Sequence, residues 1–153
     1  MDAEPVIRIQ RADFDTGAEI AAVSKGRRDV GAVVSFSGLC RDEGGALAAL
    51  ELEHYPGMAE AEIGRIAREA ATRWPVDAIT VIHRYGRIAP GENIVLVVTA
   101  SSHRQAAFDA ANFLMDFLKS NAPFWKKEHH GDGSEGGWVE AKEADEQALE
   151  RWR

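Results

Sequence analysis

The sequence predicts a mixed α+β fold in which strands and helices are interleaved along one folding unit. Its 153 residues correspond to about one domain on the usual scale of ~100–200 residues each. Runs of β-branched and aliphatic residues alternate with stretches whose apolar residues recur at helical spacing. Hydrophobic residues form 45% and charged residues 28% of the chain, as is typical of globular proteins. We therefore expect a single domain over residues 1–153.

Strands are expected where short aliphatic or β-branched runs lie between turn-forming residues. In chain order they are Val6–Gln10, Ala32–Ser37, Leu47–Tyr55, Ala78–His83, Asn93–Ala100, Phe124–Glu128 and Trp138–Ala141. Helices are expected where apolar residues return every three or four positions. They are Thr16–Ser24, 58–74, 103–120 and Glu143–Arg151. This order of elements is typical of an α+β protein.

The predicted helix 103–120 is apolar on more than one side. Phe108 and Met115 widen its apolar arc beyond a single face. Such a helix packs either between layers of its own chain or against another subunit, and both interpretations remain open. Ser102, followed three residues later by Gln105, predicts a capping box at its start.

Composition and charge exclude several classes of protein. The formal net charge of −7 disfavours nucleic acid as a partner, because the field of the protein repels phosphates. The longest aliphatic run, Ile94–Val98, is far shorter than the ~20 residues of a membrane-spanning helix. The acidic start Met1–Glu4 lacks the features of a secretory signal. A single cysteine, Cys40, can form neither an internal disulfide nor a thiolate metal cage. We expect a cytoplasmic protein.

Positive charge gathers in one part of this acidic chain. Residues 101–127 contain four basic side chains and two acidic ones, whereas residues 128–150 contain eight acidic side chains and one basic, Lys142. An ordinary solvated surface is one interpretation, and a binding site for an anion is the other. The four basic residues are Arg104, Lys119, Lys126 and Lys127.

The spacing of the lysines limits which of them can act together. Lys119 falls in the last turn of its predicted helix, where the helix dipole alone favours a positive charge. If 124–128 is a strand, Lys126 and Lys127 point to opposite faces, and only one of them can share a pocket with Lys119. Two amines in one pocket repel each other, which favours the neutral form of one of them. Such a pair is a candidate acid, base or nucleophile and would also bind an anion.

His103 and Arg104 begin the same helix, where free backbone N–H groups and the positive end of the dipole can bind an anion. A solvent-facing residue is the alternative for His103. From His103 to Lys119 is 16 residues, which is roughly 24 Å along a straight helix. Both ends therefore cannot line one small pocket within one chain. A site that uses both must be shared across a two-fold dimer.

Two other segments contain residues with chemical potential. Arg41 follows a strand and precedes a glycine-containing segment, where a guanidinium can bind a carboxylate or phosphate in bidentate fashion. Cys40 is either a sulfur carrier or a small buried apolar residue. His129 and His130 with Asp132 lack the i, i+4 spacing of a preorganised metal site, so we expect no metal.

Five ordered segments carry a family signature. They are Gly31–Arg41, Leu52–Met58, Val81–Gly86, Ser101–Arg104 and Leu118–Glu128. Together they resemble the catalytic (large) subunit of molybdopterin synthase over nearly the whole chain. The resemblance implies an α/β hammerhead fold with additional antiparallel β-structure and no cofactor. It also implies a homodimer at the centre of a heterotetramer.

The activity implied by the resemblance is a sulfur transfer in molybdenum cofactor biosynthesis. The donor would be the C-terminal Gly-Gly thiocarboxylate of a small ubiquitin-like subunit, and the acceptor cyclic pyranopterin monophosphate, which becomes the dithiolene molybdopterin. Lys119 is implied as the principal catalytic residue, an acid and base, with Lys126 in support and Lys142 as a candidate pterin contact. Substrate and tail contacts are implied at Leu39, Cys40, Arg41, Lys127, Glu128 and, from the other protomer, His103 and Arg104.

The segment Asp42–Ala46 is shorter and more acidic than the usual family loop. Leu39 and Cys40 stand where the family often has a polar or basic residue and a valine. These departures concern the loop contacts rather than Arg41. Two other functions are compatible with a cationic pocket: a module that binds a ubiquitin-like tail without transfer, and a dimeric phosphate-ester hydrolase that needs no sulfur donor.

Overall fold

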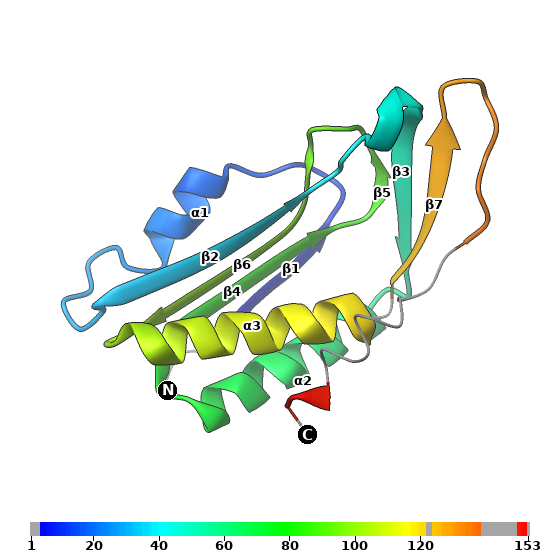
Figure 1. Ribbon diagram of the computed structural model, residues 1–153. Coiled ribbons are helices and arrows are strands. Elements are labelled where there is room, and N and C mark those ends of the chain that lie inside the picture. Colours follow the sequence, from blue (N-terminus) through cyan, green and yellow to red (C-terminus); the bar gives the residue numbers. More distant parts are fainter. Residues whose placement is uncertain (1–3, 122–123, 139–149, 153) are drawn as a thin grey trace.

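The computed structural model describes residues 4–121, 124–138 and 150–152. In these residues three α-helices and seven strands form a mixed α+β structure with two sheets (Figure 1), which confirms the predicted fold class. None of the described helices is both long enough and apolar enough to cross a membrane. The elements are β1 (Val6–Gln10), α1 (Thr16–Ala22), β2 (Ala32–Leu39), a 3₁₀ turn (Glu43–Gly45), β3 (Leu47–His54), α2 (Met58–Arg73), β4 (Val76–Arg84), β5 (Gly86–Ile88), β6 (Asn93–Ser101), α3 (Arg104–Ser120) and β7 (Phe124–His130).

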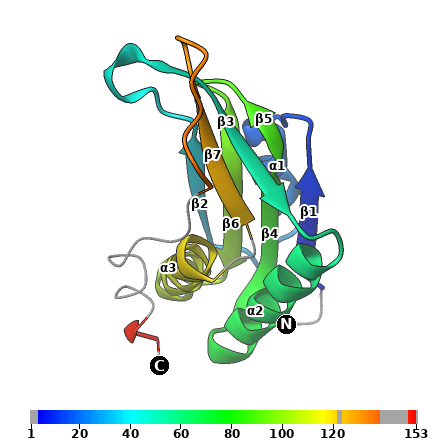
Figure 2. The same ribbon diagram turned by 90° about the vertical axis from the view of Figure 1, so that its right-hand side faces the viewer.

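The larger sheet has four strands in the order β1-β4-β6-β2. β1 runs parallel to β4, and the other neighbours are antiparallel. α2 and α3 cover one face of this sheet and α1 lies on the other (Figures 1 and 2). β4 shows the two-sided pattern that this requires: Ile79 and Val81 pack with the residues of α2 and α3, whereas Ile82 packs on the opposite side. Strands covered on both faces are apolar on both faces.

The smaller sheet, in the order β5-β3-β7, is antiparallel throughout and stands at one end of the larger sheet (Figure 1). Leu52 of β3 and Ile88 of β5 pack with Cys40 in a small core between the two sheets. The sequence did not predict β5. This strand has only three residues and begins at Gly86, whose φ of 86° favours glycine, so it has no alternating pattern to detect.

The predicted capping box at the start of α3 is wrong. Ser102 Oγ donates to the carbonyl oxygen of Asp29 (3.1 Å), and Gln105 Nε2 donates to Asp109 Oδ1 (3.0 Å). The hydroxyl is engaged by a distant loop, so the N-cap residue is His103, which makes no side-chain capping bond.

Two predictions concern the C-terminal region. Trp138 lies outside any strand, and the rest of the predicted strand Trp138–Ala141 lies outside the described residues. Most of the predicted helix Glu143–Arg151 lies outside them too.

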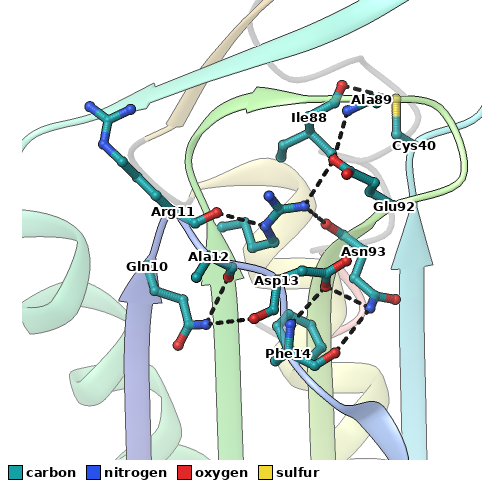
Figure 3. A network of polar contacts seen from close by, with 11 residues as sticks. Gln10, Arg11, Ala12, Asp13, Phe14, Cys40, Ile88, Ala89, Glu92 and Asn93 are labelled. Carbon is teal, nitrogen blue, oxygen red and sulfur yellow. Dashed lines mark hydrogen bonds and ion pairs between the residues drawn. The ribbon is translucent and has the colours of Figure 1, made fainter.

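A buried arginine makes polar contacts at the edge of the larger sheet that adjoins the smaller one, and Figure 3 labels its partners Arg11, Glu92 and Asn93. Arg84, the last residue of β4, is only 6% exposed. Its Nε donates to Arg11 O (2.9 Å), its Nη1 donates to Asn93 O (2.9 Å), and Nη1 lies 3.5 Å from Glu92 Oε1. The Asn93 amide in turn donates to Asp13 Oδ1 (2.8 Å). These bonds tie together the segment after β1, the end of β4 and the start of β6.

Candidate active site

The edge where the two sheets meet, which we call the junction, collects residues from several elements. The register places the end of β2 beside the start of β6, with Leu39 next to Asn93. It places the end of β4 at the same edge, with His83 next to Val95. α3 follows β6 and runs back along the sheet (Figure 1), so its last turn, with Lys119, returns to the junction.

Lys126 lies on the face of β7 that turns towards the junction. Lys126 pairs with Leu52, and Phe124 pairs with His54, so these four side chains share one face. Leu52 is buried in the core between the sheets, so this face of the smaller sheet is the one that turns towards the larger sheet. The Phe124 ring stacks on the His83 ring, with centroids 3.8 Å apart and planes inclined by 12°. Lys126 therefore follows, by two residues, an aromatic ring that is fixed at the end of β4.

Lys127 lies on the opposite face of β7, as the strand alternation predicted. Its Nζ is 3.5 Å from Glu135 Oε2 and 4.6 Å from the centre of the Trp138 ring. The two adjacent lysines thus face different surroundings, and Lys126 is the one that faces the junction.

His83 lies at the junction as a neutral imidazole. Its Nδ1 is 2.9 Å from Arg84 O. A carbonyl oxygen only accepts hydrogen bonds, so Nδ1 carries the proton and Nε2 is the bare acceptor. Burial lowers the pKa of His83 to about 4; the bond to Arg84 opposes this shift, and the charges of Lys119 and His54 add to it. The His83 imidazole therefore adds no positive charge to that of Lys119.

Two more rings surround this position. The His54 ring centroid is 4.4 Å from that of Tyr85 and 6.0 Å from that of Phe124. The Arg11 guanidinium lies over Tyr85, 4.8 Å from the ring centroid. Planar rings next to cationic side chains can bind a planar anion.

The end of β2 brings Arg41 to the same edge. Leu39 and Arg41 are exposed, whereas Cys40 between them is 3% exposed. The Cys40 backbone N–H donates to Glu92 O (2.9 Å), and its Sγ lies 3.8 Å from Ile88 O. Burial raises the pKa of the Cys40 thiol, so it stays protonated and packs as a small apolar residue. A fixed Cys40 orients the backbone at Arg41.

His103 and Arg104 lie at the other end of the larger sheet. The register at that end pairs Ala32 with Ser101, and α3 is continuous from Arg104 to Ser120. The side chains of His103 and Arg104 are exposed. The length of α3 separates them from the junction by roughly 24 Å. Within one chain, the predicted site residues thus form two groups. The β2 end, the α3 end and β7 hold Leu39, Cys40, Arg41, Lys119, Lys126, Lys127 and Glu128, the α3 start holds His103 and Arg104, and Lys142 lies outside the described residues.

The histidines of β7 make contacts of their own. His129 Nε2 lies 2.7 Å from Glu51 Oε1, His130 Nε2 lies 3.8 Å from Glu128 Oε1, and the Ser134 hydroxyl donates to Asp132 (2.6 Å). In the part of the chain that the structure describes, no three potential metal ligands are grouped so that they could hold an ion.

The sequence matches the family of MoaE proteins over residues 9–121. The chain belongs to the MoaE family. It is 78% identical over 149 residues to the molybdopterin synthase catalytic subunit of Mesorhizobium japonicum, covering 97% of this chain and 94% of the relative. The MoaE membership confirms the function predicted from the sequence, that of a molybdopterin synthase catalytic subunit, a transferase of molybdenum cofactor biosynthesis.

Solved MoaE structures agree with this fold. The molybdopterin biosynthesis MoaE protein from Burkholderia ambifaria has a TM-score of 0.83 at 49% identity, with 97% of each chain covered. The fold is also similar to a chain of the protein–protein complex of subunits 1 and 2 of molybdopterin-converting factor from Helicobacter pylori, with a TM-score of 0.73, 22% identity and 90% of each chain covered.

Three residues of this MoaE chain were missed as site residues: His83, Arg84 and Tyr85. The signal was present, because His83, Arg84 and Tyr85 directly follow the aliphatic pair Val81–Ile82 at the end of β4. Alternation along a strand puts His83 and Arg84 on opposite faces of the sheet. His83 therefore stacks on Phe124, whereas Arg84 makes its buried hydrogen bonds with Arg11 O and Asn93 O.

Proposed function

We propose that this MoaE-family chain transfers sulfur in the cytoplasm from a small ubiquitin-like subunit to cyclic pyranopterin monophosphate. The donor is a C-terminal Gly-Gly thiocarboxylate, and the product is the dithiolene of molybdopterin. The observation that supports the proposal is the junction. Its neutral His83 feels the charge of Lys119 and stacks on Phe124, which shares a face of β7 with Lys126. The similarity to the two-subunit complex of Helicobacter pylori supports a small-subunit partner.

The charges of the two reactants explain why the junction is cationic. A cyclic phosphate and a thiocarboxylate are both anions and repel each other in the absence of neutralising groups. Arg41, Lys119 and Lys126 bring them together by offsetting that repulsion, which is strongest where water is excluded. Lys119 acts as the acid and base of the sulfur addition, and Lys126 holds the anion in place.

The second half of the site comes from a second copy of the chain. Among the described strands, β2 is an edge of the larger sheet, and α3 lies next to it with the same direction (Figure 1). A two-fold axis perpendicular to β2 and α3, placed beside this edge, sets the two copies of α3 antiparallel. The start of α3 in one copy, with His103 and Arg104, then meets Lys119 of the other.

Exposed apolar side chains on both elements support this dimer. Phe36 of β2 is 40% exposed, and Phe108 of α3 is 55% exposed. Large apolar groups gathered on one edge are typical of an interface. The proposal uses both interpretations of α3: its alanine-rich face packs in the core, and we assign the exposed Phe108 to the contact with a second copy.

The remaining residues have supporting roles. Leu39 provides an apolar contact for the incoming tail, and Cys40 fixes the backbone beside Arg41. Lys127, which faces away from the junction, and the exposed Glu128 contact the small subunit rather than the reacting atoms. Lys142 remains a proposed pterin contact.

The experiment is product formation by wild type and Lys119→Ala with pyranopterin and thiocarboxylated small subunit. We expect Lys119→Ala to lose at least a hundredfold in turnover while binding the small subunit with unchanged affinity. Lys25→Ala, on the exposed loop after α1, is the control and should have wild-type turnover. A wild-type protein that binds the tail without forming dithiolene would instead be a binding module. Phosphate release without any sulfur donor would identify a hydrolase.

A further inference from the structure

One face of the His83 imidazole contacts β7, the strand that carries Lys126. Its ring is nearly parallel to that of Phe124 at a centroid distance of 3.8 Å. Phe124 is the first residue of β7, and Lys126 follows it by two positions. Lys119 lies one residue before the end of α3. The stack on His83 therefore fixes the chain to β4 at a point between the two lysines.

The orientation of the His83 ring is fixed by burial and by a hydrogen bond. It is 7% exposed, and its Nδ1–H donates to Arg84 O (2.9 Å). Arg84 is in turn held by Arg11 O and Asn93 O. The orientation of the imidazole is therefore set by the backbone at the end of β4, and the orientation of the Phe124 ring follows from it.

The chemical form of the ring suits this role. A cationic imidazole would add positive charge beside Lys119, whereas a neutral ring leaves the charge of the junction to the amines and the guanidinium. A neutral aromatic ring also stacks on phenylalanine without the cost of burying a charge.

We propose that His83 is a positioning residue for sulfur transfer: its stack on Phe124 fixes the start of β7 and thereby places Lys126 relative to Lys119. This inference rests on the proposed function. It assigns the effect to the ring face and not to proton transfer by Nε2. A displacement of about 1 Å in a positioned group can cost about a hundredfold in rate, so a stacked ring outside the reacting atoms can control turnover.

Two substitutions separate the ring from its nitrogens. His83→Phe keeps an aromatic face for Phe124 and removes both nitrogens. His83→Asn removes the ring and keeps an N–H that can donate to Arg84 O. We expect kcat of His83→Phe to stay within about threefold of wild type and kcat of His83→Asn to fall about tenfold or more. The Kd for the small subunit should be unchanged in both variants, because the exposed docking residues are not touched.

Phe124→Leu tests the stack from its other partner and keeps the proposal testable if His83→Asn does not fold. It should reproduce the loss of kcat, and the double variant His83→Asn/Phe124→Leu should lose no more than either single variant, since both remove one contact. His129→Asn, on the opposite face of β7, is the matched control and should keep wild-type kcat.

The assay is dithiolene formation by the complex of both subunits, and ¹⁵N NMR of the histidines gives a readout that does not need activity. At pH 7 the NMR signals of His83 should be those of the tautomer protonated at Nδ1. If His83→Phe is as inactive as His83→Asn, a ring nitrogen takes part in the chemistry and the proposal is wrong. If both keep wild-type kcat, His83 is a core residue only, and the proposal is also wrong. Wild-type protein that forms no dithiolene would refute the proposed function instead, while the NMR result would still test the geometry.

Discussion

The two ends of α3 differ in how much of their surroundings the chain itself supplies. At the C-terminal end, Lys119 lies at a junction built from the strands of both sheets, where His83 is buried and stacked on Phe124. At the N-terminal end, His103 and Arg104 are exposed, and the helix begins without a side-chain cap. One half of the proposed site is thus preorganised by the fold, whereas the other half is presented on the surface. In the proposed site, the exposed His103 and Arg104 act only when a second copy of the chain packs against them.

The largest expected effect tests whether these two halves act together across a dimer. Arg104→Ala and Lys119→Ala should each lose at least a hundredfold in turnover. After subunit exchange between the two variants, about half of the dimers are mixed, and one of the two sites in each mixed dimer is intact. The mixture should therefore recover about a quarter of wild-type turnover, measured as dithiolene formed per subunit.

The same mixing experiment can break the comparison. If Arg104 and Lys119 acted within one chain, no mixed dimer would contain a complete site, and turnover would stay at the level of the single variants. Size-exclusion chromatography with light scattering on each variant verifies that both remain folded and assembled.

A second prediction concerns the buried hydrogen bonds of Arg84, which support the preorganised end. Arg84→Met removes a buried guanidinium and leaves Arg11 O and Asn93 O without their donors. We expect the free energy of unfolding to fall by about 3 kcal/mol, measured by urea denaturation. Arg65→Met is the control, because Arg65 is an exposed residue of α2 that pairs with Glu62 and Glu69 and whose guanidinium lies 6.0 Å from the centre of the Phe117 ring. It should change stability by less than about 0.5 kcal/mol. Equal losses of stability in the two variants would show that the buried Arg84 contributes no more to stability than an exposed arginine.

The sequence predicted the parts of this arrangement that depend on local periodicity. Strand alternation separated Lys126 from Lys127, and the length of one helix separated His103 from Lys119. Both inferences need only the rise of a helix and the two faces of a strand. The bounds of β1 were also predicted in full, because its short β-branched run is clearly delimited.

The sequence did not predict features that depend on contacts between distant residues. His83 meets Phe124 and Arg84 meets Arg11 only after the sheets have formed, and the latter two residues are 73 positions apart in the sequence. The capping box failed for the same reason, since the Ser102 hydroxyl bonds to Asp29 rather than to its own helix. The local sequence pattern limits which contacts a side chain can make, and the tertiary fold determines which of those contacts form.

The third prediction is a pH dependence of stability that belongs to the preorganised end. The pKa of His83 is lowered from 6.5 to about 4 in the folded chain. Between these values the unfolded chain binds a proton that the folded chain does not, so stability falls as the pH falls from 6.5 towards 4. A shift of this size corresponds to about 3 kcal/mol in full, of which about 2 kcal/mol is lost between pH 7 and pH 5.

His83→Phe isolates this contribution, because Lys119 and His54, which face His83, are present in both proteins. Urea denaturation at pH 7 and pH 5 should show a loss for wild type that exceeds the loss for the variant by about 2 kcal/mol. Parallel pH dependences in the two proteins would mean that His83 is protonated without difficulty in the folded state. The junction would then be far more hydrated than its packing indicates.

The smallest expected effect concerns Cys40, the one side chain at the preorganised end that invites a sulfur-carrier mechanism. Its thiol is buried and its pKa is raised, so it is a poor nucleophile, and its link to Arg41 runs through the backbone. Cys40→Ala should lower the free energy of unfolding by about 1 kcal/mol, for a small cavity, and leave turnover within about threefold of wild type. A loss of turnover comparable to that of Lys119→Ala, with stability unchanged, would show that the thiol carries sulfur and that burial in the free chain does not persist during the reaction. Because a carrier thiol must reach both the donor tail and the pterin, such a result would also require the end of β2 to open, and hydrogen exchange at the Cys40 amide, now bonded to Glu92 O, would report that opening.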